Sequence, residues 1–161
     1  IPLYYNHLNT GRPLKEGKWF SKFTSNYLDI DNDPLYPFGY GLSYTTFKYG
    51  KPTLSSNTMT NNETISVSVD ITNTGNYDAD EIAQMYIRDL AASVSRPVKE
   101  LKGFERISIK KGETKTVTFT ITPEDLKFYN QELEYKNEPG EFEVMVGPNS
   151  KDVQTLTFTL K

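Results

Sequence analysis

The sequence contains no cysteine and only one histidine, His7, among its 161 residues. Without cysteine the chain forms no disulfide and no thiolate metal site, and its redox compartment stays undetermined. One histidine without cysteine nearly excludes a zinc site, and no serine motif accompanies it to suggest a histidine-based catalytic triad. The sequence therefore predicts no metal site and no cofactor.

A long apolar run and an excess of basic residues are also missing. No stretch of about 18 apolar residues occurs, so no membrane-spanning helix is expected. The formal net charge is −3, whereas binding to phosphate groups requires an excess of basic residues. Nucleic acid and acidic membrane surfaces are therefore not expected as partners. The chain begins at Ile1 without an initiator methionine or an apolar leader, which indicates either a removed signal or an excised piece.

The composition is that of a globular chain, with 36% hydrophobic and 24% charged residues. Its length suits one ordinary domain with a substantial extension. From Tyr49 onward, apolar and polar residues alternate, which is typical of half-buried strands. The pattern predicts strands over Thr64–Thr72, Glu81–Leu90, Lys99–Ile109, Thr116–Thr122, Leu133–Lys136, Gly140–Val146 and Val153–Leu160.

Turns rich in Gly, Asn and Pro separate these strands, and Pro123–Leu126 is expected to form one helical turn after the N-cap Thr122. Among the turns, Lys111–Glu113 and Gly147–Asn149 have the chemistry of hairpin turns and not of phosphate loops. About seven short strands separated by such turns predict an all-β fold. The expected architecture is an antiparallel β-sandwich of immunoglobulin-like topology, without the disulfide of immunoglobulin domains.

The N-terminal part has a different character, because 12 of the 21 aromatic residues lie in residues 1–49 without period 2 or 3.6. We predict that residues 1–48 form an extended, mostly irregular arm over the sandwich of residues 49–161, with a helical turn near Trp19–Phe23. Within the arm, residues 33–48 carry two prolines and two glycines, which favour an ordered connector over a helix or central strand.

Several motifs carry a resemblance to a known family. The segment Pro34–Phe47, PLYPFGYGLSYTTF, resembles the lead into the last domain of glycoside hydrolase family 3 enzymes, the β-glucosidases and β-xylosidases. The other motifs follow in the order of that family, and they are Ile1–His7, Thr10–Pro13, Arg96–Phe104, Lys111–Thr114 and Pro139–Phe142. The resemblance covers essentially the whole chain but only the C-terminal end of such an enzyme, so it favours an excised piece.

The resemblance implies a fibronectin type III-like domain that follows a linker from an α/β-sandwich domain. It places the catalytic aspartate and glutamate before Ile1, so we assign no catalytic residue here and expect the fragment alone to be inactive. The parent would hydrolyse terminal β-linked glucosyl or xylosyl units by a metal-independent, retaining reaction. Its upstream catalytic domains are the expected partners. The resemblance suggests a periplasmic or secreted location and leaves the parent's oligosaccharide substrate and a homodimer open.

Two pairs of glutamates are candidates for the carboxylate pair that glycoside hydrolysis needs. Glu132 with Glu134 and Glu141 with Glu143 lie two residues apart, which would put each pair on one strand face. We interpret both pairs as surface charge, because outward strand positions are often acidic. Asp29, Asp31 and Asp33 suggest a calcium loop, but Pro34 and Tyr40 stand where an EF-hand needs Gly and Glu. Turn capping ahead of Pro34 is the preferred interpretation.

The arm aromatics Trp19, Phe20, Tyr27 and Tyr36 could form a platform for stacking sugars. This supports an alternative hypothesis, an autonomous carbohydrate-binding or adhesion module, which predicts polysaccharide binding that is lost in Trp19→Ala. The preferred interpretation is that these rings anchor the arm to the sandwich or to other domains. The loop Arg96–Glu100 lies between predicted strands, where it either lines a domain interface or is simply structural.

Overall fold

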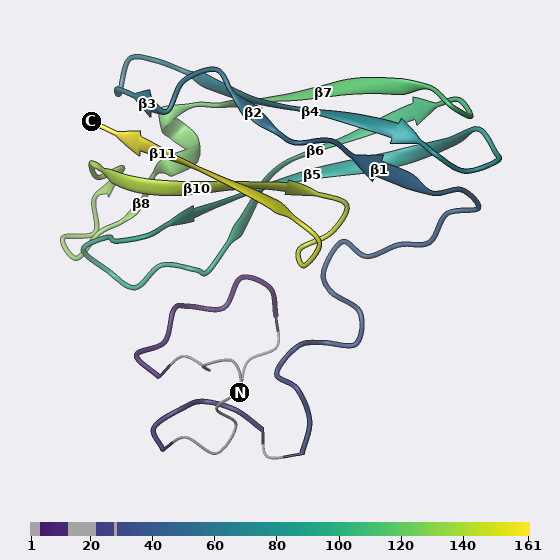
Figure 1. Ribbon diagram of the computed structural model, residues 1–161. Coiled ribbons are helices and arrows are strands. Elements are labelled where there is room, and N and C mark those ends of the chain that lie inside the picture. Colours follow the sequence, from purple (N-terminus) through teal and green to yellow (C-terminus); the bar gives the residue numbers. More distant parts are fainter. Residues whose placement is uncertain (1–3, 13–21, 28) are drawn as a thin grey trace.

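The computed structural model describes residues 4–12, 22–27 and 29–161, and Figure 1 shows two packed β-sheets with an irregular arm beside them. The elements are β1 Phe47–Tyr49, β2 Thr53–Leu54, β3 Thr58–Met59, β4 Ile65–Asn73, β5 Ala79–Asp89, β6 Glu100–Ile109, β7 Thr114–Ile121, the 3₁₀ turn η1 Pro123–Leu126, β8 Phe128–Tyr129, β9 Tyr135–Lys136, β10 Gly140–Gly147 and β11 Gln154–Leu160. The predicted all-β sandwich with an irregular N-terminal arm is thereby confirmed.

In the first sheet, β4 pairs with β7 and also with both β1 and β2. The second sheet has the order β3-β11-β10-β5-β6, and β8 and β9 form a separate two-stranded hairpin. All pairs are antiparallel except β3 with β11, where Thr58 and Met59 run parallel to Thr159 and Leu160. This parallel pair was not expected, because two residues show no periodicity.

The core lies between the two sheets and consists of the inward-facing residues of each strand. In β4 the alternation is clear, with Ile65, Val67, Val69 and Ile71 buried. Across from them, Phe142 stacks on Phe158, with 5.5 Å between ring centroids. Such pairing of alternating strands is what closes a sandwich around one core.

Each strand predicted from alternation is present, with shifts at the ends. The segment Leu133–Lys136 is the largest exception, since only Tyr135 and Lys136 are in a strand. The helical turn Pro123–Leu126 is confirmed as η1, where the amide of Thr122 donates to Asp125 over 2.8 Å. The short strands β1, β2, β3 and β8 were missed.

The arm contains no helix or named strand in residues 4–12, 22–27 and 29–46. The helical turn predicted near Trp19–Phe23 lies mostly outside the described residues. β1 begins at Phe47 and pairs with β4, while the division of the chain into residues 1–48 and 49–161 stays a prediction. Among the described residues, no helix is long and apolar enough to cross a membrane.

Candidate functional site at the junction of arm and sandwich

The first arm segment pairs with the loop between β5 and β6. Leu8 forms an isolated antiparallel bridge with Pro97. The amide of Asn9 donates to the Arg96 carbonyl over 3.0 Å, and the amide of Val98 donates to the His7 carbonyl over 2.9 Å. These backbone contacts give the loop Arg96–Glu100 a role that its sequence did not reveal, because it holds the arm.

An aromatic cluster joins both arm segments to the sandwich. Tyr5 stacks on Phe38 with 4.1 Å between ring centroids, and its ring meets the buried Tyr86 of β5 edge-on at 5.7 Å. The Phe38 carbonyl also accepts a hydrogen bond of 2.9 Å from the amide of Ser150 in the β10–β11 turn. Stacked and edge-on rings of this kind add specific geometry to apolar burial.

The side chain of Gln84 in β5 joins the second arm segment to the β10–β11 turn. Its Nε2 donates to the Gly39 carbonyl over 3.1 Å and to the Pro148 carbonyl over 2.6 Å, while its Oε1 accepts from the Tyr86 hydroxyl. Gly39 has φ +79°, and the Tyr40 amide donates to the Pro37 carbonyl, which matches a type II turn. A Cβ at Gly39 would overlap the Gln84 amide, so glycine is required here for two reasons.

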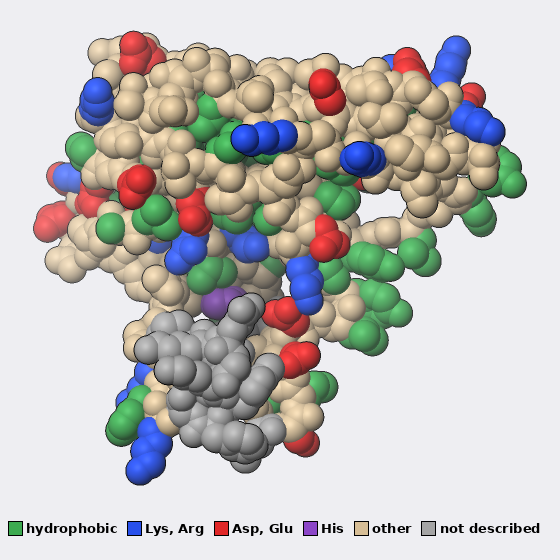
Figure 2. Space-filling view, in the orientation of Figure 1, with side chains coloured by type: hydrophobic (Ala, Val, Ile, Leu, Met, Phe, Trp, Pro, Cys, Tyr) green, Lys and Arg blue, Asp and Glu red, His purple; other side chains and the backbone are tan. Residues whose placement is uncertain are grey.

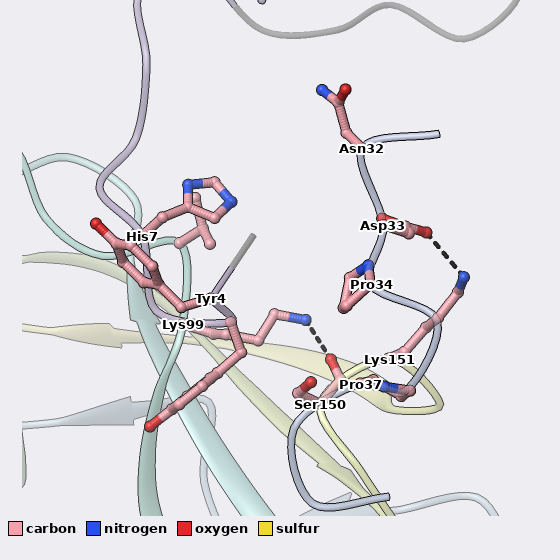
Figure 3. A pocket seen from close by; sticks show the side chains of 11 residues that line it. Tyr4, His7, Asn32, Asp33, Pro34, Pro37, Lys99, Ser150 and Lys151 are labelled. Atoms are coloured by element: carbon pink, nitrogen blue, oxygen red, sulfur yellow. Dashed lines mark hydrogen bonds and ion pairs between the residues drawn. The ribbon is translucent and has the colours of Figure 1, made fainter. Parts of the chain in front are cut away.

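A cavity of about 330 Å³ lies between the arm and the sandwich, and Figure 3 shows the side chains around it. Lys99 Nζ donates to the Ser150 carbonyl over 2.6 Å, and Lys151 Nζ lies 2.8 Å from Asp33 Oδ2. Burial lowers the pKa of Lys99, and Arg88 lowers it further, against the weaker opposing effects of Asp33 and Glu143. The cavity thus contains a half-buried ammonium group.

A second cavity of about 330 Å³ lies between residues 39–45 of the arm, β1, the start of β5 and the β10–β11 turn. Here the Tyr49 hydroxyl donates to Glu81 Oε1 over 2.9 Å. Burial raises the pKa of the Glu81 carboxyl despite this hydrogen bond, and burial together with the Glu81 charge raises the pKa of Tyr49. The other carboxylate among the described residues that line this cavity is Asp80, which pairs with Arg106 and accepts a hydrogen bond from Ser108.

The structure separates the two glutamate pairs. Glu141 and Glu143 share a face of β10, and Glu143 forms an ion pair of 3.4 Å with Arg88. Glu132 and Glu134 do not share a strand face, because both lie in the turn before β9, where their amides donate to the side chain of Asn130. The expectation that this pair lies on a strand was wrong, since the local hydrogen bonds of a buried Asn130 decide the backbone there.

The candidate metal ligands are not brought together. Asp33 pairs with Lys151, and Asn32 instead makes the local turn contacts, accepting from the Tyr27 amide and donating to the Ser25 carbonyl. His7 Nδ1 lies 3.0 Å from the Leu8 carbonyl. Within the described part of the chain, no group of three or more His, Asp or Glu side chains could hold a metal ion.

Of the four arm aromatics proposed as a sugar platform, Trp19 and Phe20 lie outside the described residues. Tyr27 is half-buried, and Tyr36 is exposed beside Tyr40 with 5.3 Å between ring centroids. Sequence reasoning missed Gln84, Gly39 and Ser150 as residues whose hydrogen bonds fix the arm. The sequence did indicate that Gln84 lies in a covered strand, because both faces of that strand carry residues suited to burial.

The chain is similar to known proteins over nearly its whole length. Residues 81–150 match the family model of the fibronectin type III-like domain. The chain is 54% identical to a periplasmic β-glucosidase of Salmonella typhimurium over 99% of this chain and 21% of that protein. It is 51% identical to a putative β-xylosidase of Formosa agariphila over 86% of this chain and 18% of that protein.

Solved structures give the same result. The β-glucosidase from Listeria innocua, in complex with gluconolactone, superposes with a TM-score of 0.92 and 45% identity, over 99% of this chain and 22% of that one. The chain therefore spans about a fifth of the length of the relatives that it matches.

Proposed function

The chain is the C-terminal, fibronectin type III-like domain of a family 3 glycoside hydrolase, and we propose that its arm docks this non-catalytic accessory domain against the preceding catalytic domains. The proposed activity of the whole protein is hydrolysis of terminal β-linked glucosyl or xylosyl units. The relatives named β-glucosidase and β-xylosidase support this activity.

The observation that carries the proposal is the two-sided character of residues 33–44. Their inner side is fixed to the sandwich through Asp33, Phe38 and Gly39. Their outer side exposes large apolar side chains, with Leu42 90% and Tyr44 96% accessible. Figure 2 shows hydrophobic side chains gathered along this part of the arm. A contiguous apolar surface on a well-fixed segment is typical of an interface with another domain.

Hydrolysis of aryl β-glucoside and β-xyloside tests the accessory role. The 161-residue chain is assayed beside the full-length parent, and activity is expected only in the parent. Activity in the fragment would mean that a carboxylate pair interpreted as surface charge is catalytic.

A double variant tests the docking surface. In the parent, Leu42→Ser with Tyr44→Ser is expected to lower the temperature of thermal inactivation, because burying such side chains contributes about 1.5–3 kcal/mol each. The same double variant should leave unfolding of the 161-residue chain unchanged, since both side chains are exposed there. Leu133→Ser, at the 79% exposed tip of the β8–β9 turn, is the matched control. Equal effects of the control and the double variant would contradict docking through the arm.

The exposed Tyr36–Tyr40 pair favours one second candidate, direct binding of oligosaccharide by the arm. Titration of the chain with β-glucans and xylans by calorimetry tests it. Binding heat that disappears in Tyr36→Ala would support this role, and no heat with any of these polysaccharides would exclude it.

A further inference from the structure

The cavity between arm and sandwich has an excess of positive charge, although the whole chain carries a formal net charge of −3. Lys99 and Lys151 both line it, and His7 lies at its edge. Among the described lining residues the one carboxylate is Asp33, and Lys151 already pairs with it at 2.8 Å. The charge of Lys99 is therefore left without a direct counter-ion in this cavity.

Lys99 has the geometry of an unfilled binding group. Among the described residues its ammonium group has one hydrogen-bond partner, the Ser150 carbonyl, whereas such a group has three donors. Lys99 takes part in none of the ion pairs among residues 4–12, 22–27 and 29–161. Figure 3 shows its side chain reaching across the cavity toward Ser150. A half-buried ammonium that is hydrogen-bonded only to a carbonyl gains most from an anionic partner.

The walls of the cavity strengthen this effect. Tyr4, Tyr5, Pro34 and Pro37 supply apolar or aromatic surface around the charged groups. Charges interact more strongly where such surface excludes water. Burial lowers the pKa of Lys99, and a bound anion would reverse that change.

We infer that this cavity binds one carboxylate group, which accepts a charge-assisted hydrogen bond from Lys99 Nζ. The carboxylate has two sources, a free organic acid such as a uronic acid or an acidic side chain of the preceding catalytic domain. The second source rests on the proposed function, whereas the first does not. Binding involves no covalent step, and the ligand is recognised by its charge and its planar pair of oxygens.

The first experiment uses the unmutated 161-residue chain and compares glucuronate with glucose, which has the same ring but no carboxylate. Binding is followed by calorimetry and by NMR titration of the Lys99 side chain. Glucuronate is expected to bind and to raise the pKa of Lys99, because a ligand that prefers the charged ammonium must stabilise it in return. Glucose is expected to do neither. This readout needs no variant and therefore does not depend on the folding of a mutant.

Two variants of equal charge change then locate the site. Lys99→Gln is expected to weaken glucuronate binding at least tenfold, while Lys48→Gln, at an exposed position of β1 outside the cavity, should leave it unchanged. Equal binding of glucose and glucuronate, no shift of the Lys99 pKa, or equal affinity in both variants would overturn the proposal.

The full-length protein distinguishes the two sources. Binding of glucuronate to the parent would support a free acid as the ligand. A Lys99 pKa that is already raised in the parent, together with loss of glucuronate binding, would support a side chain of the catalytic domain. Neither result requires hydrolysis, so failure of the carboxylate site would leave the accessory function untouched.

Discussion

Substituting Gly39 by alanine should release the arm without unfolding the sandwich. The residue occupies the third position of the Pro37–Tyr40 turn with φ +79°, a conformation that L residues rarely adopt. Its carbonyl accepts from Gln84 Nε2, and a Cβ here would overlap the same Gln84 amide. The substitution therefore strains the backbone and displaces the hydrogen-bonded side chain together.

The size of the effect follows from these two contributions. The left-handed conformation costs alanine about 1–2 kcal/mol. Loss of the Gln84 hydrogen bond costs a further 0.5–1.5 kcal/mol or so, which gives about 1.5–3.5 kcal/mol in total. Since each 1.4 kcal/mol corresponds to about a tenfold change in an equilibrium constant, the arm should open about 10-fold to 300-fold more often.

Amide hydrogen exchange measures this opening directly. The Ser150 amide donates to the Phe38 carbonyl and reports on the arm, whereas the Val69 amide reports on the core strand β4. In Gly39→Ala, exchange at Ser150 should accelerate while exchange at Val69 stays the same. Equal acceleration at both amides would refute the idea that the arm opens as a separate unit.

Substitutions at two other glycines separate the effect of backbone strain from the effect of the overlap with Gln84. Gly112 has φ +75° with no neighbouring atom near its Cβ position, and Gly41 has neither a positive φ nor a close neighbour. Gly112→Ala should therefore lose only the strain contribution, and Gly41→Ala should be close to neutral. A Gly39→Ala loss no larger than that of Gly112→Ala would show that the Gln84 contact contributes nothing.

Three other substitutions test separate parts of the structure. Asn73→Ala should lower the free energy of unfolding, measured by urea titration, by about 3 kcal/mol, because this fully buried side chain makes four hydrogen bonds. As a control, Asn61→Ala at an exposed position should change the free energy of unfolding little. Glu81→Gln should raise the free energy of unfolding at pH 7 but not at pH 4. Burial raises the pKa of Glu81, so the contribution of its carboxyl to stability is complete at low pH, where the group is protonated, and is lost as the pH rises through the folded-state pKa. Tyr5→Ala should speed exchange of the Val98 amide, which donates to His7, because the ring no longer stacks on Phe38.

The sandwich could be predicted from the sequence because strands such as β4 and β7 alternate over eight or more residues. In β4 and β7, one apolar residue in two is enough to specify the buried face. The strands β1, β2 and β3 have two or three residues each, which is too short for a period to show. Their positions depend on pairing with β4 and β11, and these are tertiary contacts that local sequence does not contain.

The contacts of the arm could not be predicted for a related reason. Gln84 and Ser150 lie far from the arm in the sequence, and each donates one hydrogen bond to an arm carbonyl. Glycine and proline in residues 33–48 indicate turns, but they do not say which carbonyl meets which donor. The glutamates at 132 and 134 show the reverse case, where the spacing suggested a strand and the local bonds of Asn130 made a turn.

The fixed arm has a consequence for how this domain meets its neighbours. Docking through a disordered segment must first offset the entropy of ordering it, which is about 1–2 kcal/mol for the backbone of each residue. Here the sandwich supplies that order, because the carbonyls of Phe38 and Gly39 and the carboxylate of Asp33 are all bound to groups of the sandwich. Leu42 and Tyr44 follow directly after this fixed segment, so their apolar surface is presented to a partner at little entropic cost. The same reasoning explains why a change at Gly39, which contacts no catalytic group, should weaken attachment of the domain more than a change at either exposed side chain alone.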